Sequence, residues 1–112
     1  MSARSETMLW LAQRATAALL ALCVVAHLAT MIVAVRGGLS AADILGRTRG
    51  SAAWATFYGV FVLAVAIHAP IGLRTVVGEW LQWRGRVADA CCVAVGLLLL
   101  ALGWRAIAAV TL

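Results

Sequence analysis

The stretch from Trp54 to Trp80, WATFYGVFVLAVAIHAPIGLRTVVGEW, is predominantly apolar over the length of a bilayer and carries one imidazole, His68, near its middle. A helix needs about 20 mostly apolar residues to cross the hydrocarbon core of a membrane. An ionisable side chain at that depth is costly and by default marks a functional position. The chain must therefore fold so that His68 faces other protein groups or a ligand instead of lipid.

The composition indicates that the solvent of this chain is a bilayer. Hydrophobic residues occupy 65% of the 112 positions and charged residues 12%, whereas a soluble domain carries about 25% charged residues. The positive charge comes from arginines alone, which lie at the ends of apolar runs or just inside them. Arginine in such places extends its guanidinium to the lipid headgroups. No basic run with interleaved aromatic residues indicates binding to nucleic acid.

Two further apolar runs accompany the first. Together they predict one all-α membrane domain, a bundle of three transmembrane helices over residues 8–35, 52–74 and 87–110. A continuation of the second helix along the interface to Trp83 is compatible with the sequence. The first run is too long for the apolar part of a signal peptide, so we expect it to be retained as a helix. The linker before the third helix is short, which makes the second and third helices antiparallel neighbours.

Local signals mark the ends and bends of these helices. Gly37 and Gly38 end the first helix, because glycine favours the C-terminal cap. Ser40 followed by Asp43 has the spacing of a capping box and predicts a short interfacial helix. Pro70 removes a backbone hydrogen bond and predicts a kink two residues after His68.

Small residues on the third helix predict packing. Ala88, Cys92 and Gly96 recur every four residues, a spacing that lets helices approach closely. The three cysteines lie inside apolar runs and are odd in number, which argues against a disulfide framework. The chain has no CxxCH motif for covalent haem attachment. No cysteine or carboxylate lies at ligand spacing near either histidine, which argues against zinc.

The helix face that carries His68 has the properties of a slot for a large flat ligand. Ala64 and Gly72, four residues before and after His68, leave space beside the imidazole. Three aromatic residues on the same face predict a rim for that slot: Trp54, Phe57 and Phe61. A b-type haem needs one or two axial imidazoles and a dry slot. The alternative is that His68 only hydrogen-bonds a neighbouring helix.

The second histidine, His27, shares a face of the first helix with Thr16, Cys23 and Thr30. Counted from the helix ends, His27 and His68 differ in depth by about 10 Å at 1.5 Å per residue. Two axial ligands of one upright haem need nearly equal depths, so we expect the pair not to share one iron. His27 is then the ligand of a separate outer haem, or a structural residue. Each site would need its second ligand from a partner chain or a second copy.

Arg14 and Arg74 are suited to bind haem propionates or a quinone head group, because guanidinium forms bidentate bonds with carboxylates. The alternative is that both reach lipid headgroups. Five arginines lie on the N-terminal side of the membrane and four on the other, which favours a cytoplasmic N-terminus. The first set is Arg4, Arg14, Arg74, Arg84 and Arg86, and the second is Arg36, Arg47, Arg49 and Arg105.

Two motifs, LAQRATAALLAL in the first helix and AIHAPIGLR followed by EW in the second, resemble the membrane-anchor cytochrome b subunits of succinate dehydrogenase and fumarate reductase. The resemblance covers most of the chain. It implies that His68 is the axial ligand of haem b and that Arg14 lies near a haem propionate and the quinone. Glu79 and Trp80 correspond to an acidic-aromatic pair in which a tyrosine helps to bind quinone in relatives. Tryptophan replaces that tyrosine here.

His27 corresponds to the outer-haem ligand found in two-haem versions of this family. The resemblance thus implies a haem b-binding anchor of a succinate:quinone or fumarate:quinone oxidoreductase in a bacterial-type inner membrane. One or two haems would be shared with a partner chain, and quinone would be the substrate.

The anchor would have no catalytic residue of its own. It lacks a dinucleotide-binding glycine pattern and a cysteine cluster, so flavin and iron–sulfur centres must lie in partner subunits. The alternatives are a non-haem three-helix scaffold or assembly protein, and a cytochrome b anchor of a different dehydrogenase.

Overall fold

The computed structural model describes residues 2–112, which form four helices and no strand. The helices are α1 (Ala3–Gly37), α2 (Ala41–Thr48), α3 (Ala52–Trp80) and α4 (Arg86–Thr111). α1, α3 and α4 are long and apolar enough to cross a membrane. The predicted all-α fold with three membrane helices is confirmed, and so is the short helix between the first two.

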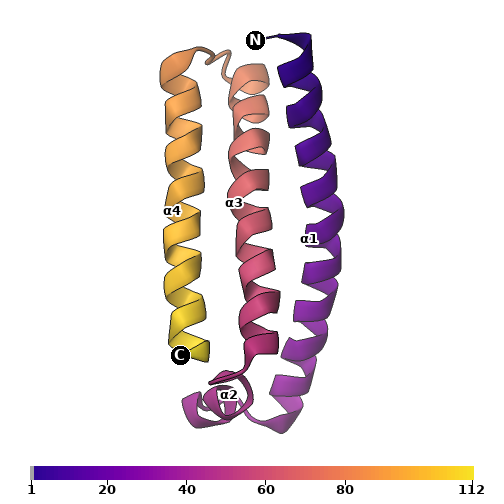
Figure 1. Ribbon diagram of the computed structural model, residues 1–112, viewed down its shortest axis with the longest axis vertical. Helices are drawn as coiled ribbons and strands as arrows, with labels where there is room; N and C mark the ends of the chain where they lie inside the picture. Colours follow the sequence, from indigo (N-terminus) through magenta and orange to yellow (C-terminus); the bar gives the residue numbers. More distant parts are fainter. Residues whose placement is uncertain (1) are drawn as a thin grey trace.

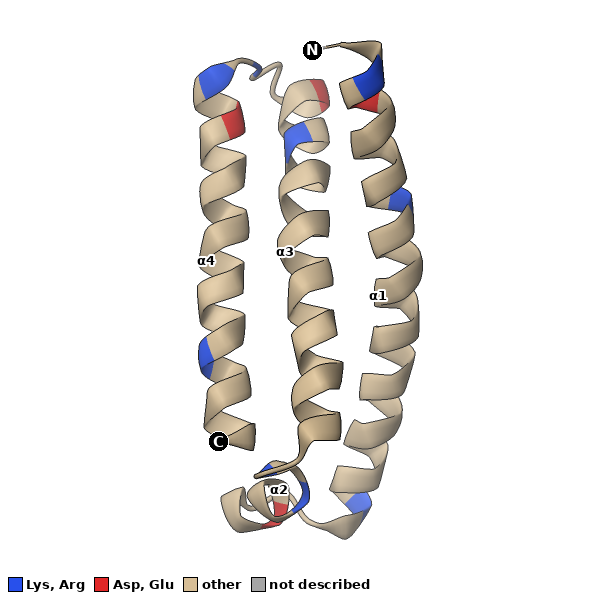
Figure 2. Cartoon of the chain, in the orientation of Figure 1, with Lys and Arg blue, Asp and Glu red and all other residues tan. Residues whose placement is uncertain are grey.

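The three long helices lie side by side with α3 in the middle (Figure 1), and α3 packs against both α1 and α4. The start of α1, the end of α3 and the start of α4 meet at one end of the bundle, which we call the Arg74 end. α2 and the C-terminus lie at the other end, which we call the α2 end. Charged residues gather mostly toward these two ends (Figure 2). This distribution suits a bundle whose middle lies in hydrocarbon.

α1 is longer than the sequence pattern predicts, because capping groups extend it at both ends. It begins at Ala3, where Ser2 accepts a hydrogen bond from the backbone N–H of Ser5 at 3.2 Å. It ends at Gly37, and Gly38 follows with a φ of 126°, which favours glycine. The side chain of Arg47 donates to the carbonyl of Gly38 at 2.7 Å. Polar residues outside the apolar run therefore continue the helix.

α2 begins with the predicted capping box. The Ser40 hydroxyl accepts from the backbone N–H of Asp43 at 3.1 Å, and the Asp43 carboxylate accepts from the backbone N–H of Ser40 at 3.2 Å. Hydrogen bonds from the Ser40 side chain, and then from its backbone, hold the pKa of Asp43 below its ordinary value. Because its pKa is lower in the folded state, the ionised Asp43 carboxylate stabilises the cap at neutral pH. This stabilisation is lost as the pH falls through the acidic range and the carboxylate is protonated.

Ser40→Ala is expected to raise the pKa of Asp43 toward its ordinary value. The substitution removes the hydrogen bond from the Ser40 hydroxyl, which lowers that pKa more than any other contact. Carbon-13 NMR titration of labelled aspartate measures this shift. Ser51→Ala is the matched control, because Ser51 caps α3 by accepting from the N–H of Trp54 at 3.2 Å and has no contact to a carboxylate. An unchanged Asp43 pKa in Ser40→Ala would contradict the role of the capping box.

Hydrogen bonds join the end of α2, and the loop after it, to the end of α4, a contact that the sequence does not predict. The Thr48 hydroxyl donates to the carbonyl of Val110 at 2.6 Å, and the Gly50 N–H donates to the carbonyl of Thr111 at 2.8 Å. The last carbonyls of a helix have no partner within the helix, so these bonds satisfy acceptors that would otherwise need water. The loop between α1 and α3 thereby closes the α2 end.

α3 and α4 meet through the predicted small residues. Ala88 and Cys92 are buried. A Cβ added to Gly96 would lie 2.5 Å from Cγ of Pro70 and 3.0 Å from the carbonyl oxygen of Ala66. α3 continues as one helix through Pro70, whose ring fills the space that Gly96 leaves. The absence of a side chain at Gly96 therefore sets how closely the two helices approach.

Candidate functional site

His68 faces α1 and lies close to Thr16. Its Nδ1 atom lies 3.2 Å from the Thr16 hydroxyl oxygen, and Thr16 is buried. The imidazole is therefore held between two membrane helices. If His68 serves only to hydrogen-bond a neighbouring helix, the bond that this alternative requires is the contact to Thr16.

That hydrogen bond uses only one of the two ring nitrogens. Nε2 of His68 makes no hydrogen bond within residues 2–112. It also does not belong to the enclosed polar atoms without partners in that part of the chain, which are Oε1 of Gln13 and Nδ1 of His27. Nε2 is therefore not fully enclosed by residues 2–112, and in one tautomer it offers a lone pair to a ligand.

The space predicted beside His68 is partly filled by α1. A Cβ added to Gly72 would lie 3.0 Å from Nε2 of Gln13, and Ala64 is only 3% exposed. Small residues at these positions let α1 pack closely against α3, so they serve helix packing on this face. A flat ligand at His68 would have to reach Nε2 from the side of the α1–α3 pair.

Of the aromatic residues predicted as a rim for His68, Phe61 contacts His27, and Trp54 and Phe57 belong to the same aromatic cluster. The rings of Tyr58 and Phe61 contact the His27 imidazole edge-on, with centroids 5.9 and 6.0 Å away. Trp54 stacks on Tyr58 at 5.7 Å, and Phe57 contacts both Tyr58 and Phe61. The predicted aromatic rim around His68 was wrong, because the sequence shows which residues share a face of α3 but not which residues of α1 lie opposite them. Tyr58 was missed, although it directly follows Phe57.

A mostly apolar cavity of about 660 Å³ adjoins His27 at the α2 end. Parts of α1 and α2 and the first turns of α3 line it, including His27, Thr30, Ile44, Thr48, Trp54 and Tyr58. Its volume lies within the range of about 300–1,000 Å³ that is usual for small-molecule sites. Nδ1 of His27 is enclosed and has no hydrogen-bond partner within the described chain.

The two histidines lie at different depths, as the sequence predicts. His68 is level with Thr16 of α1, and His27 follows Thr16 by eleven residues, about 16 Å along the helix axis. On α3, Phe61 contacts His27 and precedes His68 by seven residues, about 10 Å along the axis. One ligand cannot be held between the two imidazoles in the manner of a bis-histidine haem.

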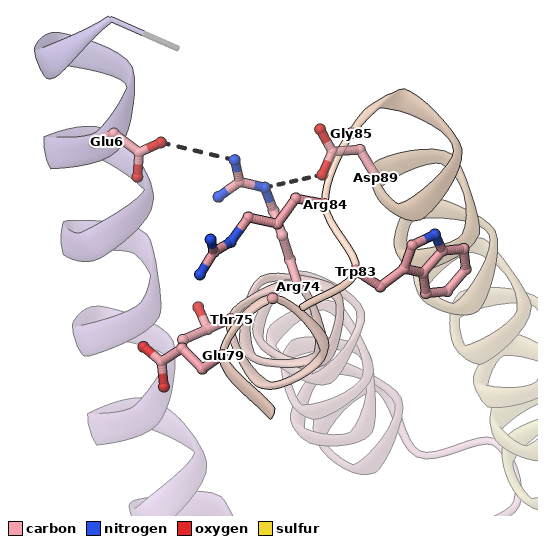
Figure 3. A pocket seen from close by; sticks show the side chains of 9 residues that line it. Glu6, Arg74, Thr75, Glu79, Trp83, Arg84, Gly85 and Asp89 are labelled. Atoms are coloured by element: carbon pink, nitrogen blue, oxygen red, sulfur yellow. Dashed lines mark hydrogen bonds and ion pairs between the residues drawn. The ribbon is translucent and has the colours of Figure 1, made fainter. Parts of the chain in front are cut away.

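Arg74 bridges all three membrane helices at one end of the bundle. Its Nε donates to Oδ1 of Asp89 in α4 at 3.0 Å, and a terminal nitrogen lies 3.7 Å from Oε1 of Glu6 in α1. Figure 3 shows Arg74 between these two carboxylates. The ion pairs are half-exposed, where such pairs contribute about 0–1 kcal/mol each. Glu6 and Asp89 were missed by the sequence analysis, although each is the first acidic residue of its helix.

A polar pocket of about 280 Å³ lies beside this ion-pair cluster. Glu79 and Arg84 line the pocket together with Arg74 (Figure 3). Trp80 is 81% exposed and does not line it. The predicted acidic-aromatic pair is therefore divided between the pocket and the surface of the bundle.

Arg14 takes a different position from Arg74. It is exposed on α1, with its guanidinium 5.5 Å from the centre of the Trp10 ring. A guanidinium over an indole face is held by a cation–π interaction. Arg14 thus packs on the Trp10 ring, whereas Arg74 forms ion pairs with Glu6 and Asp89.

Comparison with known proteins identifies the family of this chain. The model of the family described as succinate dehydrogenase/fumarate reductase transmembrane subunit matches residues 1–103. No curated protein and no solved structure gives a significant match. With three helices that can span a bilayer and a family match over most of its length, the chain is a multi-pass membrane protein. It belongs to the succinate dehydrogenase/fumarate reductase transmembrane subunit family.

Proposed function

We propose that this chain is the haem b-binding membrane anchor of a succinate:quinone or fumarate:quinone oxidoreductase. In this role it docks the iron–sulfur and flavoprotein subunits and contributes to electron transfer to quinone. The observation that carries the proposal is the pair of ring nitrogens of His68: Nδ1 contacts the Thr16 hydroxyl, and Nε2 has no hydrogen-bond partner within residues 2–112. Haem b, when bound, supplies one-electron oxidation and reduction.

The donor set at His68 fits haem better than a bare metal ion. Residues 2–112 contain no group of three His, Cys, Asp or Glu side chains that could hold an ion. Zinc sites need three or four such protein ligands. Haem brings its own ring of nitrogen ligands and requires only axial imidazoles from protein. A single accessible imidazole in an apolar helix meets that requirement on one side of the iron.

The second axial ligand of this site must come from another chain, because His27 lies at a different depth. A second anchor subunit or a second copy of this chain would provide it. α1 packs mainly against α3, and many of its large apolar side chains are exposed, including Leu22 and Val25. These faces leave room for the helices of a partner as well as for lipid.

His27 is the candidate ligand for a second haem at the α2 end, which the adjoining apolar cavity supports. The His27 imidazole differs from that of His68 in its Nδ1 atom. Nδ1 of His68 is hydrogen-bonded to Thr16, whereas Nδ1 of His27 has no hydrogen-bond partner in the described chain. A second haem at His27 would therefore have to bind an imidazole with no partner on its enclosed nitrogen. The proposal includes one haem at His68 and extends to two if His27 is also a ligand.

The Arg74 end is proposed to face the cytoplasm and to hold the quinone and the haem propionates, with the chain in a bacterial-type inner membrane. Arg14, Arg74 and Glu79 supply the polar groups at this end, and the exposed indole N–H of Trp80 is a further donor. Arg74 is already paired, so a propionate would replace Glu6, its more distant partner at 3.7 Å.

Expression of the chain with the flavoprotein, iron–sulfur and any second anchor subunit encoded beside it tests the proposal. The purified complex is expected to show a b-type reduced-minus-oxidised spectrum, one or two haems per chain pair, and reduction of the haem by succinate. A complex that assembles without haem would favour the scaffold alternative, which the Thr16–His68 hydrogen bond alone would satisfy. Copurification with a different flavoprotein would favour an anchor of another dehydrogenase.

A further inference from the structure

Thr16 forms the only side-chain hydrogen bond to His68 within residues 2–112, and its hydroxyl oxygen has three neighbours. The carbonyl oxygen of Ala12 lies 2.7 Å away, the carbonyl oxygen of Gln13 3.2 Å, and Nδ1 of His68 3.2 Å. A hydroxyl group has one hydrogen to donate and two lone pairs. The position of that hydrogen therefore decides which nitrogen of His68 carries a proton.

The hydrogen of Thr16 points to Ala12. Two oxygen atoms 2.7 Å apart are at the ideal distance for an O–H···O hydrogen bond, and without a hydrogen between them their lone pairs would repel. Only a lone pair of the hydroxyl oxygen is then directed at His68. Nδ1 must supply the hydrogen of the contact, so it carries the proton in the neutral ring.

We infer that Thr16 is a positioning residue that holds His68 as the Nδ1–H tautomer and thereby presents the lone pair of Nε2 to iron. The inference rests on the proposed function for the identity of the ligand, but its first step concerns the chain alone. A hydrogen bond donated by the second ring nitrogen of a ligand histidine fixes the ring and raises the basicity of the ligating nitrogen. Stronger donation stabilises the oxidised iron and lowers the reduction potential.

His27 provides an internal comparison. Thr30 lies on the same helix as His27, but its hydroxyl donates to the backbone carbonyl of His27 at 2.7 Å, and Nδ1 of the ring has no partner in the part of the chain that the structure describes. Both threonines thus bond a carbonyl of their own helix, and only Thr16 also contacts an imidazole across the helix interface. Thr30→Val is therefore a matched control for Thr16→Val.

The first experiment uses the full chain, without haem, in lipid nanodiscs with nitrogen-15 histidine. The chain has two histidines, and His68→Gln identifies the signals of His27. Nδ1 of His68 is expected to give a protonated-nitrogen resonance and Nε2 an unprotonated one. Thr16→Val should shift His68 toward a mixture of tautomers, Thr16→Ser should restore the original pattern, and Thr30→Val should leave it unchanged. An Nε2–H tautomer in the unmodified chain, or a pattern insensitive to Thr16→Val, would overturn the inference.

The second experiment uses the assembled complex and measures the haem potential and the low-spin electron paramagnetic resonance spectrum. Thr16→Val is expected to raise the potential and change the spectrum while haem content stays near that of the unmodified complex. Thr16→Ser is expected to restore both values. A potential unaffected by Thr16→Val would overturn the inference while haem binding still stands. A haem-free complex whose His68 tautomer depends on Thr16 would instead reject the proposed function and keep the tautomer assignment.

Discussion

Replacing His68 by alanine is expected to abolish the b-type absorbance of the haem proposed at α3, because the iron would lose the axial ligand that the proposal takes from this chain at that depth. The loss is complete if the complex holds one haem and about half if His27 binds a second. Haem content per purified complex, together with the reduced-minus-oxidised spectrum, measures it. The variant also loses the hydrogen bond to Thr16, but such bonds between membrane helices contribute on average only about 0.6 kcal/mol, so the bundle should still fold.

His27→Ala is the matched control for this prediction, since both substitutions remove an imidazole from the α1–α3 interface. It is expected to leave the haem proposed at His68 in place and to remove a second haem if one is present. Size-exclusion chromatography and helical circular dichroism establish that each variant is assembled. Unchanged haem content in an assembled His68→Ala complex would reject His68 as a ligand.

The largest expected effect on stability comes from Gly96→Ala in α4. The new Cβ would lie 2.5 Å from the ring of Pro70 and 3.0 Å from the backbone oxygen of Ala66. Neither neighbour is a flexible side chain, so α3 and α4 must separate. Overpacking of this kind typically costs about 1–3 kcal/mol. Reversible unfolding in mixed detergent micelles, followed by circular dichroism, measures the change.

Gly59→Ala serves as the control, because among residues 2–112 no atom outside the local backbone of α3 lies within 4 Å of a Cβ at Gly59. Alanine is favoured over glycine inside a helix by about 1 kcal/mol, so this substitution should be neutral or stabilising. The two variants make the same chemical change with opposite expected signs. Equal effects from both would show that helix propensity, and not the α3–α4 contact, determines the outcome.

The sequence by itself determined the number of membrane helices, the capped α2 helix and the small-residue face of α4. Each of these depends on local rules that operate over a few residues, such as span length or cap spacing. The separation of His27 and His68 also followed from the sequence, because the rise per residue of a helix converts position into depth. The family motifs around Arg14 and His68 belong to the same class of local information.

The tertiary structure decided which side chains meet across the interfaces. The long helices are apolar on nearly all sides, and lipid contacts such surfaces about as favourably as protein does, so hydrophobicity does not specify how one helix is rotated against the next. Small residues such as Gly72 and Gly96 fix that rotation by allowing close approach. This close approach places Thr16 beside His68 and Phe61 beside His27. The partners of Arg74 come from two other helices, and they could be identified only once the helices were placed.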